Sequence, residues 1–336
     1  LWCFLVAGLL AAVGLVTRMS TACAFPGFAI LILFGEHVSS VPLRDRNWWW
    51  LKIRRGLWFV VGILPGLLFN LWYNSMRFGS WGLTGYEQKA PEWFGNSIWL
   101  GMADFLVSPG RGLLPYVPLI CALPLFYRPF CRRSAVFATA VLVTSVTYLL
   151  FYSQFGRLGL WSWGPHYLLP IIPLLVLPWA EALESWSLLS RLRRTVFIVL
   201  VTLSCTLQLA SVSASYLRTY VSAASAGVHI DSALDWDLEW SPLLKQGENI
   251  FHVVHNIATS RDFESVTALG IDHQYLLDNE LALNVLDWWW VLAMYRGVRW
   301  AWVIAAIALW WAMMTLFRLL KALDGTMSSE PTRISD

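Results

Sequence analysis

The chain has 336 residues, of which 57% are hydrophobic and only 13% are charged. Soluble domains carry about 25% charged residues, so this composition excludes an ordinary soluble protein. It predicts an all-α, polytopic bundle of transmembrane helices. The net charge of +3 is small and its cations lie in loops, which argues against nucleic acid as a partner. The five cysteines suggest neither a disulfide framework nor a metal site.

The apolar runs that cross or nearly cross a bilayer predict about eight membrane segments: 1–17, 19–35, 56–73, 113–127, 134–152, 166–183, 195–216 and 291–317. Several are shorter than the about 20 residues of a straight span, which predicts short or broken helices. The chain opens inside an apolar run, without an initiator Met or the features of a signal peptide. We therefore expect a fragment that lacks N-terminal spans.

Basic residues orient the segments. They concentrate in the connections 36–55, 128–133 and 184–194 and just after the last run. If the runs alternate, these connections share one side, which the positive-inside rule makes cytoplasmic. The predicted organisation is a bundle over 1–216 with outer-face loops 74–112 and 153–165, an acidic extracytoplasmic lobe over 217–290, a last transmembrane helix over 291–320, and a disordered cytoplasmic tail over 321–336.

The predicted outer face contains arginines that the charge rule disfavours, among them Arg18, Arg77 and Arg111. One explanation is ion pairing with an outer-face acid, namely Glu87, Glu92 or Asp104. The other is binding of a phosphate or diphosphate, which suits guanidinium forks. Arg111 lies in the turn SPGRG, whose glycines let backbone N–H groups approach an anion in front of a helix N-terminus. The same letters also describe an ordinary helix-entry turn.

Aromatic residues surround the predicted outer-face turns. The stretch FGRLGLWSWGPHYLLPIIP (155–173) brings His166 and Tyr167 to the start of a span, where the histidine is either a simple hydrogen-bonding group or a donor to a phosphate. Most of the 22 tryptophans suit anchoring at membrane boundaries. Trp93 and Trp163 are also candidates for stacking on a sugar.

Metal-binding patterns are weak. Asp235 and Asp237 have the D-x-D spacing of metal-bound nucleotide sugars, and His252 and His255 lie three apart on an expected helix. The glutamate of H-E-x-x-H is absent. A divalent metal therefore stays open as a cofactor, without a defined site. No hydrolase, ATPase or redox motif is present.

Several motifs resemble those of a known family. The stretch GLLAAVGLVTRMSTACAFPGFAILILFG resembles an internal span of GT-C-type glycosyltransferases, the group of protein O-mannosyltransferases and aminoarabinose transferases. A further set of motifs, in this order along the chain, more closely resembles a bacterial group of large membrane proteins assigned as polyprenyl-phosphate-dependent glycosyltransferases. The motifs are YNSMRFGSWGLTGY, SPGRGLLPYVP, WSWGPHYLLPIIPLL, SPLLKQ and DWWW. The resemblance covers about residues 4–317.

The resemblance implies a multi-pass enzyme of the bacterial inner membrane, active on its outer face. It would transfer a sugar from a polyprenyl-phosphate carrier to a glycan, lipid or protein acceptor. The usual catalytic base, an acid in the first outer loop, would lie upstream of this fragment, which leaves Asp104 and Glu87 as candidates. The expected substrate-binding residues are Arg18, Arg77, Tyr86, Arg111, Trp163, His166 and Tyr167.

The chain departs from the family pattern at two positions. His166 stands where an arginine is expected after WSWGP, and Asp104 stands before SPGRG where a small or apolar residue is expected. A transporter or flippase of a lipid-linked substrate is the main alternative, but it would place charges at mid-membrane depth, where these spans have almost none. A non-catalytic membrane scaffold leaves the Arg–Gly–Pro turns unexplained.

Overall fold

The computed structural model describes residues 1–35, 46–85, 94–155, 162–184, 186–228, 235–258, 286, 288–295, 298 and 300–328. Over these ranges the chain is helical and contains no β-strand, only isolated bridges between Phe94 and Phe155 and between Ala214 and Leu286. The all-α prediction is confirmed. The chain forms two compact units, one of residues 1–208 with 226–245 and one of residues 209–225 with 246–336.

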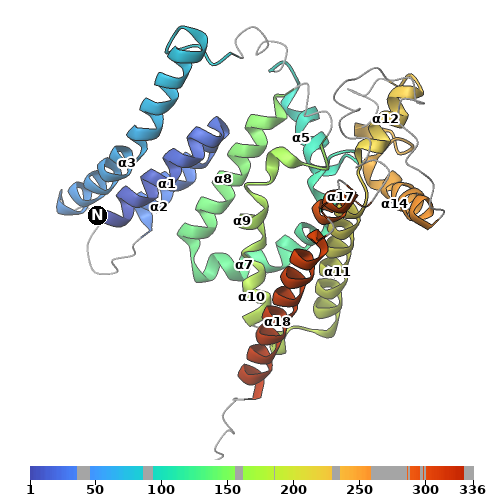
Figure 1. Ribbon diagram of the computed structural model, residues 1–336. Coiled ribbons are helices and arrows are strands. Elements are labelled where there is room, and N and C mark those ends of the chain that lie inside the picture. The colour runs from blue at the N-terminus through green and yellow to red at the C-terminus, as the bar shows by residue number, and fades with distance from the viewer. Residues whose placement is uncertain are drawn as a thin grey trace, which may run out of the picture. The chain divides into compact units, whose positions relative to one another are not determined.

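The first unit begins with two long helices that pack side by side, α1 (Trp2–Thr17) and α3 (Arg46–Phe78) (Figure 1). Between them lie η1 (Met19–Ala24) and α2 (Phe25–Phe34). Glycines form the α1–α3 crossing: a Cβ on Gly8 would meet the carbonyl of Phe59, and one on Gly66 would lie 2.7 Å from the Cβ of Ala12. Small residues of this kind let helix backbones approach closely in membranes.

Helix α8 (Ala135–Ser153) is packed against α2, α5 (Ile98–Val107) and α7 (Leu123–Arg133). Its buried residues Tyr148 and Tyr152 join Phe105 of α5 and the later residues Leu168 and Ile171 in one hydrophobic cluster. This cluster fixes the end of α8 against the two turns that carry the candidate site.

Prolines break two of the predicted spans, as the short apolar runs suggested. The first becomes α6 (Leu113–Tyr116), η2 (Pro118–Ala122) and α7, with an irregular backbone at Val117, which precedes a proline. The second becomes η3 (His166–Leu168), α9 (Ile172–Val176), α10 (Trp179–Glu184) and, just beyond it, η4 (Trp186–Leu188). Prolines lack the N–H group that a continuous helix needs, so each run is divided into short pieces.

Within the described residues, three helices are long and apolar enough to cross a membrane: α3, over Trp48–Phe78, α8 and α11 (Arg191–Ser213). They support membrane-spanning segments, whereas the number of eight stays a prediction. The expected run 56–73 is only the apolar part of α3, which extends past it at both ends. Of α11, residues up to 208 belong to the first unit and the rest to the second.

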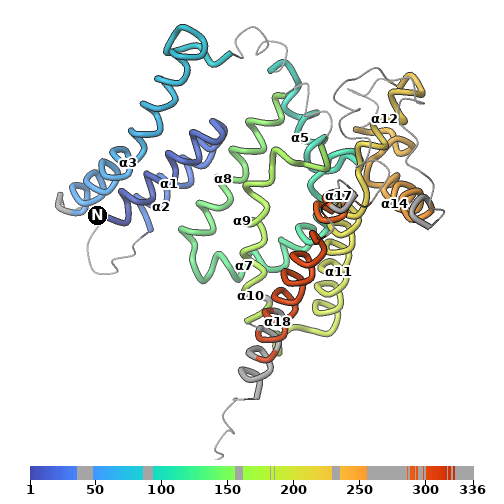
Figure 2. Tube along the Cα trace, viewed as in Figure 1, coloured from blue at the N-terminus to red at the C-terminus, as the bar shows by residue number. Residues whose placement is uncertain are grey.

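The second unit contains α12 (Leu217–Ser225), most of α14 (Pro242–Ala258), α17 (Trp289–Tyr295) and α18 (Ala301–Ser328), the last two in contact (Figure 2). The buried Gln246 donates from Nε2 to the carbonyls of Ala210 and Ala214, at 2.7 and 2.6 Å. Asn249 donates to the hydroxyl of Thr219 at 3.0 Å. The expected lobe 217–290 is thus shared between the units, since residues 226–245 belong to the first, and residues 259–285 lie outside the described part.

Candidate functional site

The turn 108–112, called here the Arg111 turn, connects α5 to α6. The fully buried Ser108 donates from Oγ to the carbonyl of Asp104 at 2.7 Å and accepts a bond from the backbone N–H of Arg111 at 3.2 Å. A Cβ on Gly112 would lie 2.5 Å from the carbonyl oxygen of Ser108, so glycine is needed for this tight path. The turn therefore holds Arg111 in a defined place between two helices.

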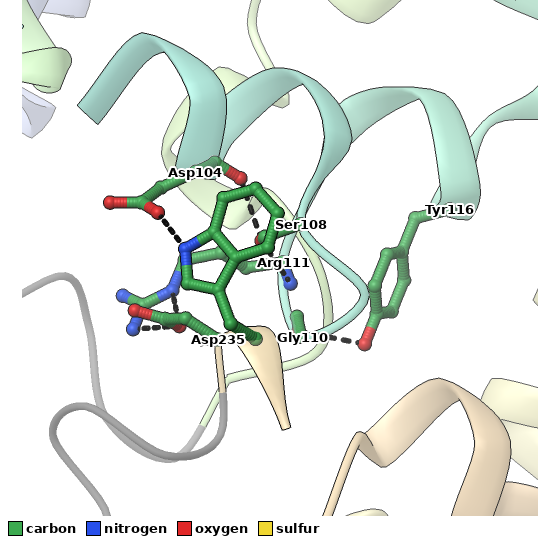
Figure 3. Close-up of polar contacts among 7 residues, drawn as sticks. Asp104, Ser108, Gly110, Arg111, Tyr116 and Asp235 are labelled. Atoms are coloured by element: carbon green, nitrogen blue, oxygen red, sulfur yellow. Dashed lines mark hydrogen bonds and ion pairs between the residues drawn. The ribbon is translucent and has the colours of Figure 1, made fainter. Parts of the chain in front are cut away.

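Arg111 forms an ion pair with Asp235, which is 124 residues away in sequence (Figure 3). Its Nε and Nη2 both donate to Oδ1 of the carboxylate, and the two side chains are only 12% and 13% exposed. The backbone carbonyl of Asp235 also accepts a bond from the N–H of Gly110 at 3.1 Å. Ion pairing with an acid of the outer loop was one of the two explanations offered by the sequence for Arg111. The structure shows an ion pair with an acid from the distant acidic segment.

Two further bonds join residues 235–241, called here the clamp segment, to the same region. Trp236 donates from its indole Nε1 to Oδ1 of Asp104 at 2.5 Å, and Ser241 donates from Oγ to the carbonyl of Pro109 at 2.7 Å. Asp104 is 6% exposed, and burial raises the pKa of its carboxyl, while the Trp236 bond and the charge of Arg111 lower it. The candidate acid, which lies in α5, is therefore bonded both to the Arg111 turn and to the clamp segment.

Arg18 lies directly after α1 in extended backbone. Its guanidinium carbon sits 4.8 Å from the ring centre of Tyr167 and 5.7 Å from that of Tyr152, two rings that stack with centres 4.7 Å apart. Cations bind favourably over aromatic faces. Within the described residues Arg18 has no carboxylate partner, so its positive charge is not compensated by an ion pair there.

His166 lies in the short turn η3, ahead of the apolar helix α9. Its pKa is lowered to about 4, first by burial and then by the charges of Arg18 and Arg111. The imidazole is therefore neutral near neutral pH. The charges of both arginines act on this one ring, and we refer to Arg18, Arg111 and His166 as the arginine–histidine cluster. Tyr167 belongs to it through its contact with Arg18.

Trp163 packs beside this cluster. Its ring meets that of Tyr116 edge-on, with centres 4.9 Å apart, and the Tyr116 hydroxyl donates to the carbonyl of Gly110 at 2.8 Å. Gly164, with a φ of +55°, lies so close that a Cβ would be 2.5 Å from the Tyr116 ring. The WSWGP turn and the Arg111 turn are thereby joined through one buried tyrosine, while sugar stacking by Trp163 stays a prediction.

Other predicted residues are not brought into the cluster. Arg77 donates to the hydroxyl of Tyr73, and its guanidinium lies over the rings of Tyr73 and Phe78 at 5.7 and 5.4 Å, all on or beside its own helix. Tyr86, Glu87, Glu92 and Trp93 lie outside the described residues.

The residues of the weak metal-binding patterns make other contacts in the structure. Asp235 binds Arg111, and Oδ1 of Asp237 accepts the N–H of Glu239 at 2.9 Å. His255 stacks on Phe251, with ring centres 6.2 Å apart. Across the described ranges, no group of three His, Cys, Asp or Glu side chains is arranged to hold a metal ion.

No protein-family model, curated protein or solved structure matches this chain. The resemblance seen in its motifs therefore stays an expectation.

Sequence reasoning missed the clamp segment and Tyr152. Asp235 is one of many acids in its segment, and nothing in its local sequence distinguishes the one that reaches Arg111. Tyr152 ends an apolar run, a position that is also typical of membrane anchoring. Together, the guanidinium groups of Arg18 and Arg111 and the neutral imidazole of His166 provide hydrogen-bond donors of the kind that bind a phosphate.

Proposed function

We propose that this chain is a multi-pass GT-C-type glycosyltransferase of the bacterial inner membrane. It transfers a sugar from a polyprenyl-phosphate carrier to a glycan, lipid or protein acceptor on the outer face. The observation that supports the proposal is the arginine–histidine cluster, formed by three sequence-distant segments that the charge pattern assigns to the same outer face.

The cluster suits the phosphate of such a carrier. Arg18 supplies a guanidinium that no carboxylate among the described residues compensates, held by the faces of two tyrosines. Arg111 is fixed in a tight turn and adds a second guanidinium, whose charge acts on the same histidine as that of Arg18. As the bond between sugar and phosphate breaks, negative charge develops on the phosphate. Donors that are already in place stabilise that charge without reorganising.

Asp104 is the candidate base within the described residues. One carboxylate oxygen accepts the Trp236 bond, and its second oxygen makes no hydrogen bond with described residues. A base removes the proton of the acceptor hydroxyl as that oxygen attacks the anomeric carbon of the sugar. Burial raises the pKa of Asp104, which strengthens it as a base as long as it stays ionised. Glu87 remains the other candidate.

A transfer assay tests the proposal. The chain is reconstituted in liposomes with radiolabelled polyprenyl-phosphate sugars and a membrane extract that supplies acceptors. We expect label to leave the carrier, and Arg18→Ala and Arg111→Ala to reduce the rate at least about a hundredfold, since each removes a charged donor from the leaving phosphate. Arg77→Ala is the matched control, because its contacts lie away from the cluster. Equal rates for all three variants would rule out this site.

A further inference from the structure

The clamp segment contacts the Arg111 turn at several points, and Asp235 makes two of these contacts. Its side chain binds the guanidinium of Arg111, and its backbone carbonyl binds the N–H of the preceding residue, Gly110. Ser241 binds the carbonyl of Pro109 at the other end of the segment. One residue from a distant part of the chain therefore fixes both the backbone and the side chain of the turn (Figure 3).

We propose that Asp235 is a positioning residue for Arg111, holding the guanidinium in place at the Arg111 turn so that it is ready to bind the carrier phosphate. The inference rests on the proposed function, because it assumes that the cluster binds a phosphate. It adds a residue from the acidic segment to the machinery of the site.

The geometry of the pair favours this role. Asp235 accepts the N–H groups of Nε and Nη2 with a single oxygen, so it contacts one edge of the planar fork. The planar guanidinium carries further N–H groups on its remaining edges, and it keeps its charge when paired. A long arginine side chain that is already ordered loses less conformational freedom when a ligand binds. The low exposure of both partners keeps that order in the absence of ligand.

The opposite role for Asp235 would be competition, in which its carboxylate occupies Arg111 and must leave before a phosphate binds. The two roles predict opposite effects of removing the negative charge. Asp235→Asn keeps the size of the side chain and loses the charge, so it weakens phosphate binding if Asp235 positions Arg111 and strengthens binding if Asp235 competes.

The test measures binding of farnesyl phosphate, a short polyprenyl phosphate, to the full chain in lipid nanodiscs, with farnesol as the control for the apolar tail. We expect Asp235→Asn to weaken binding about tenfold, the cost of one charge-assisted hydrogen bond. We expect Asp235→Glu to recover part of the loss. Asp237→Asn, two residues away, is the matched control: Oδ1 of Asp237 accepts the N–H of Glu239 within its own segment, and we expect this variant to bind as the wild type does.

A double-mutant cycle separates positioning from a general loss of structure. If Asp235 acts through Arg111, Asp235→Asn has no further effect on binding once Arg111→Ala is present. Unchanged or tighter binding by Asp235→Asn, or effects that add in the double variant, overturns the inference. If Asp235→Asn does not fold, Asp235→Glu decides: binding as weak as that of Arg111→Ala overturns it.

The same measurements distinguish this inference from the proposed function. If farnesyl phosphate still binds to both the Arg18→Ala and the Arg111→Ala variants, the proposed phosphate site is wrong, and the role of Asp235 is wrong with it. Binding that is lost in these variants but unchanged in Asp235→Asn leaves the site in place and removes only the role of Asp235.

Discussion

At the scale of single residues, the pKa of His166 responds to the positive charges of the cluster. Burial and the charges of Arg18 and Arg111 disfavour its protonated form, which lowers its pKa from 6.5 to about 4. A phosphate bound between the arginines would offset their charge and raise the pKa again. The histidine that replaces the expected arginine therefore adds a neutral hydrogen-bonding group near neutral pH, and the arginines supply the charge.

Stability should depend on pH through this residue. The folded state holds His166 with a depressed pKa, so between pH 6.5 and about 4 the unfolded chain binds more protons than the folded chain. The contribution of His166 is fully retained above 6.5 and declines as the pH falls toward 4. We expect His166→Asn to lose less thermal stability than the wild type over this window. The measurement is the Tm in nanodiscs at several pH values, and parallel curves for the two proteins would contradict the assignment.

The sequence predicted part of this site. The predicted topology puts Arg18, Arg111 and His166 on one face, and the charges of both arginines lower the pKa of this histidine. It did not predict the partner of Arg111, because a carboxylate pairs by spatial proximity and the acidic segment offers many carboxylates with similar neighbours. The same limit applies to Arg77, which shares the predicted face but contacts rings on or beside its own helix.

At the scale of helices, close packing of α1 on α3 depends on positions without a side chain. A Cβ on Gly8 would meet the backbone carbonyl of Phe59, and one on Gly62 would meet that of Leu5. Backbone atoms cannot rotate away as a flexible side chain can, so the helices themselves would have to separate. Such glycines are read easily as helix weakeners in a sequence, since glycine is a poor helix former.

Gly8→Ala should therefore destabilise the chain, although alanine is the better helix former. We expect a loss of about 1–3 kcal/mol, typical of overpacking. Gly56→Ala in α3 is the control, because no atom lies within 4 Å of its added Cβ. There the better helix propensity should act alone and stabilise by up to about 1 kcal/mol. Thermal unfolding followed by circular dichroism compares the two, and a neutral Gly8→Ala would show that the helices are not so closely packed.

The sequence predicted some features of the helices well and the length of one helix poorly. The short apolar runs predicted broken helices, and the proline-rich runs 113–127 and 166–183 are divided into short pieces, whereas the single Pro65 lies inside the continuous helix α3. The extent of α3 was underestimated, since hydropathy marks only its apolar middle. Its first turns carry the basic residues of the connection, and its last turn carries Arg77. Lysine and arginine are good helix formers, so a basic segment next to a span can continue the helix.

At the scale of the whole molecule, composition and three long apolar helices point to a membrane, and the charge pattern orients the chain in it. The orientation bears directly on the proposed function, which requires the cluster to face the side on which a lipid-linked sugar would be presented. Chemical access from one side of the membrane tests this orientation.

Cysteine labelling tests the orientation directly. Trp81, 60% exposed after α3, is expected on the outer face, and Leu188, 85% exposed after α10, on the cytoplasmic face. In a background without the native cysteines, a membrane-impermeant maleimide added to intact spheroplasts should label Trp81→Cys and spare Leu188→Cys. Permeabilised cells should label both, which controls for reactivity. The reverse pattern in intact spheroplasts would place the arginine–histidine cluster on the cytoplasmic side, where the positive-inside rule accounts for its arginines without any need for a phosphate.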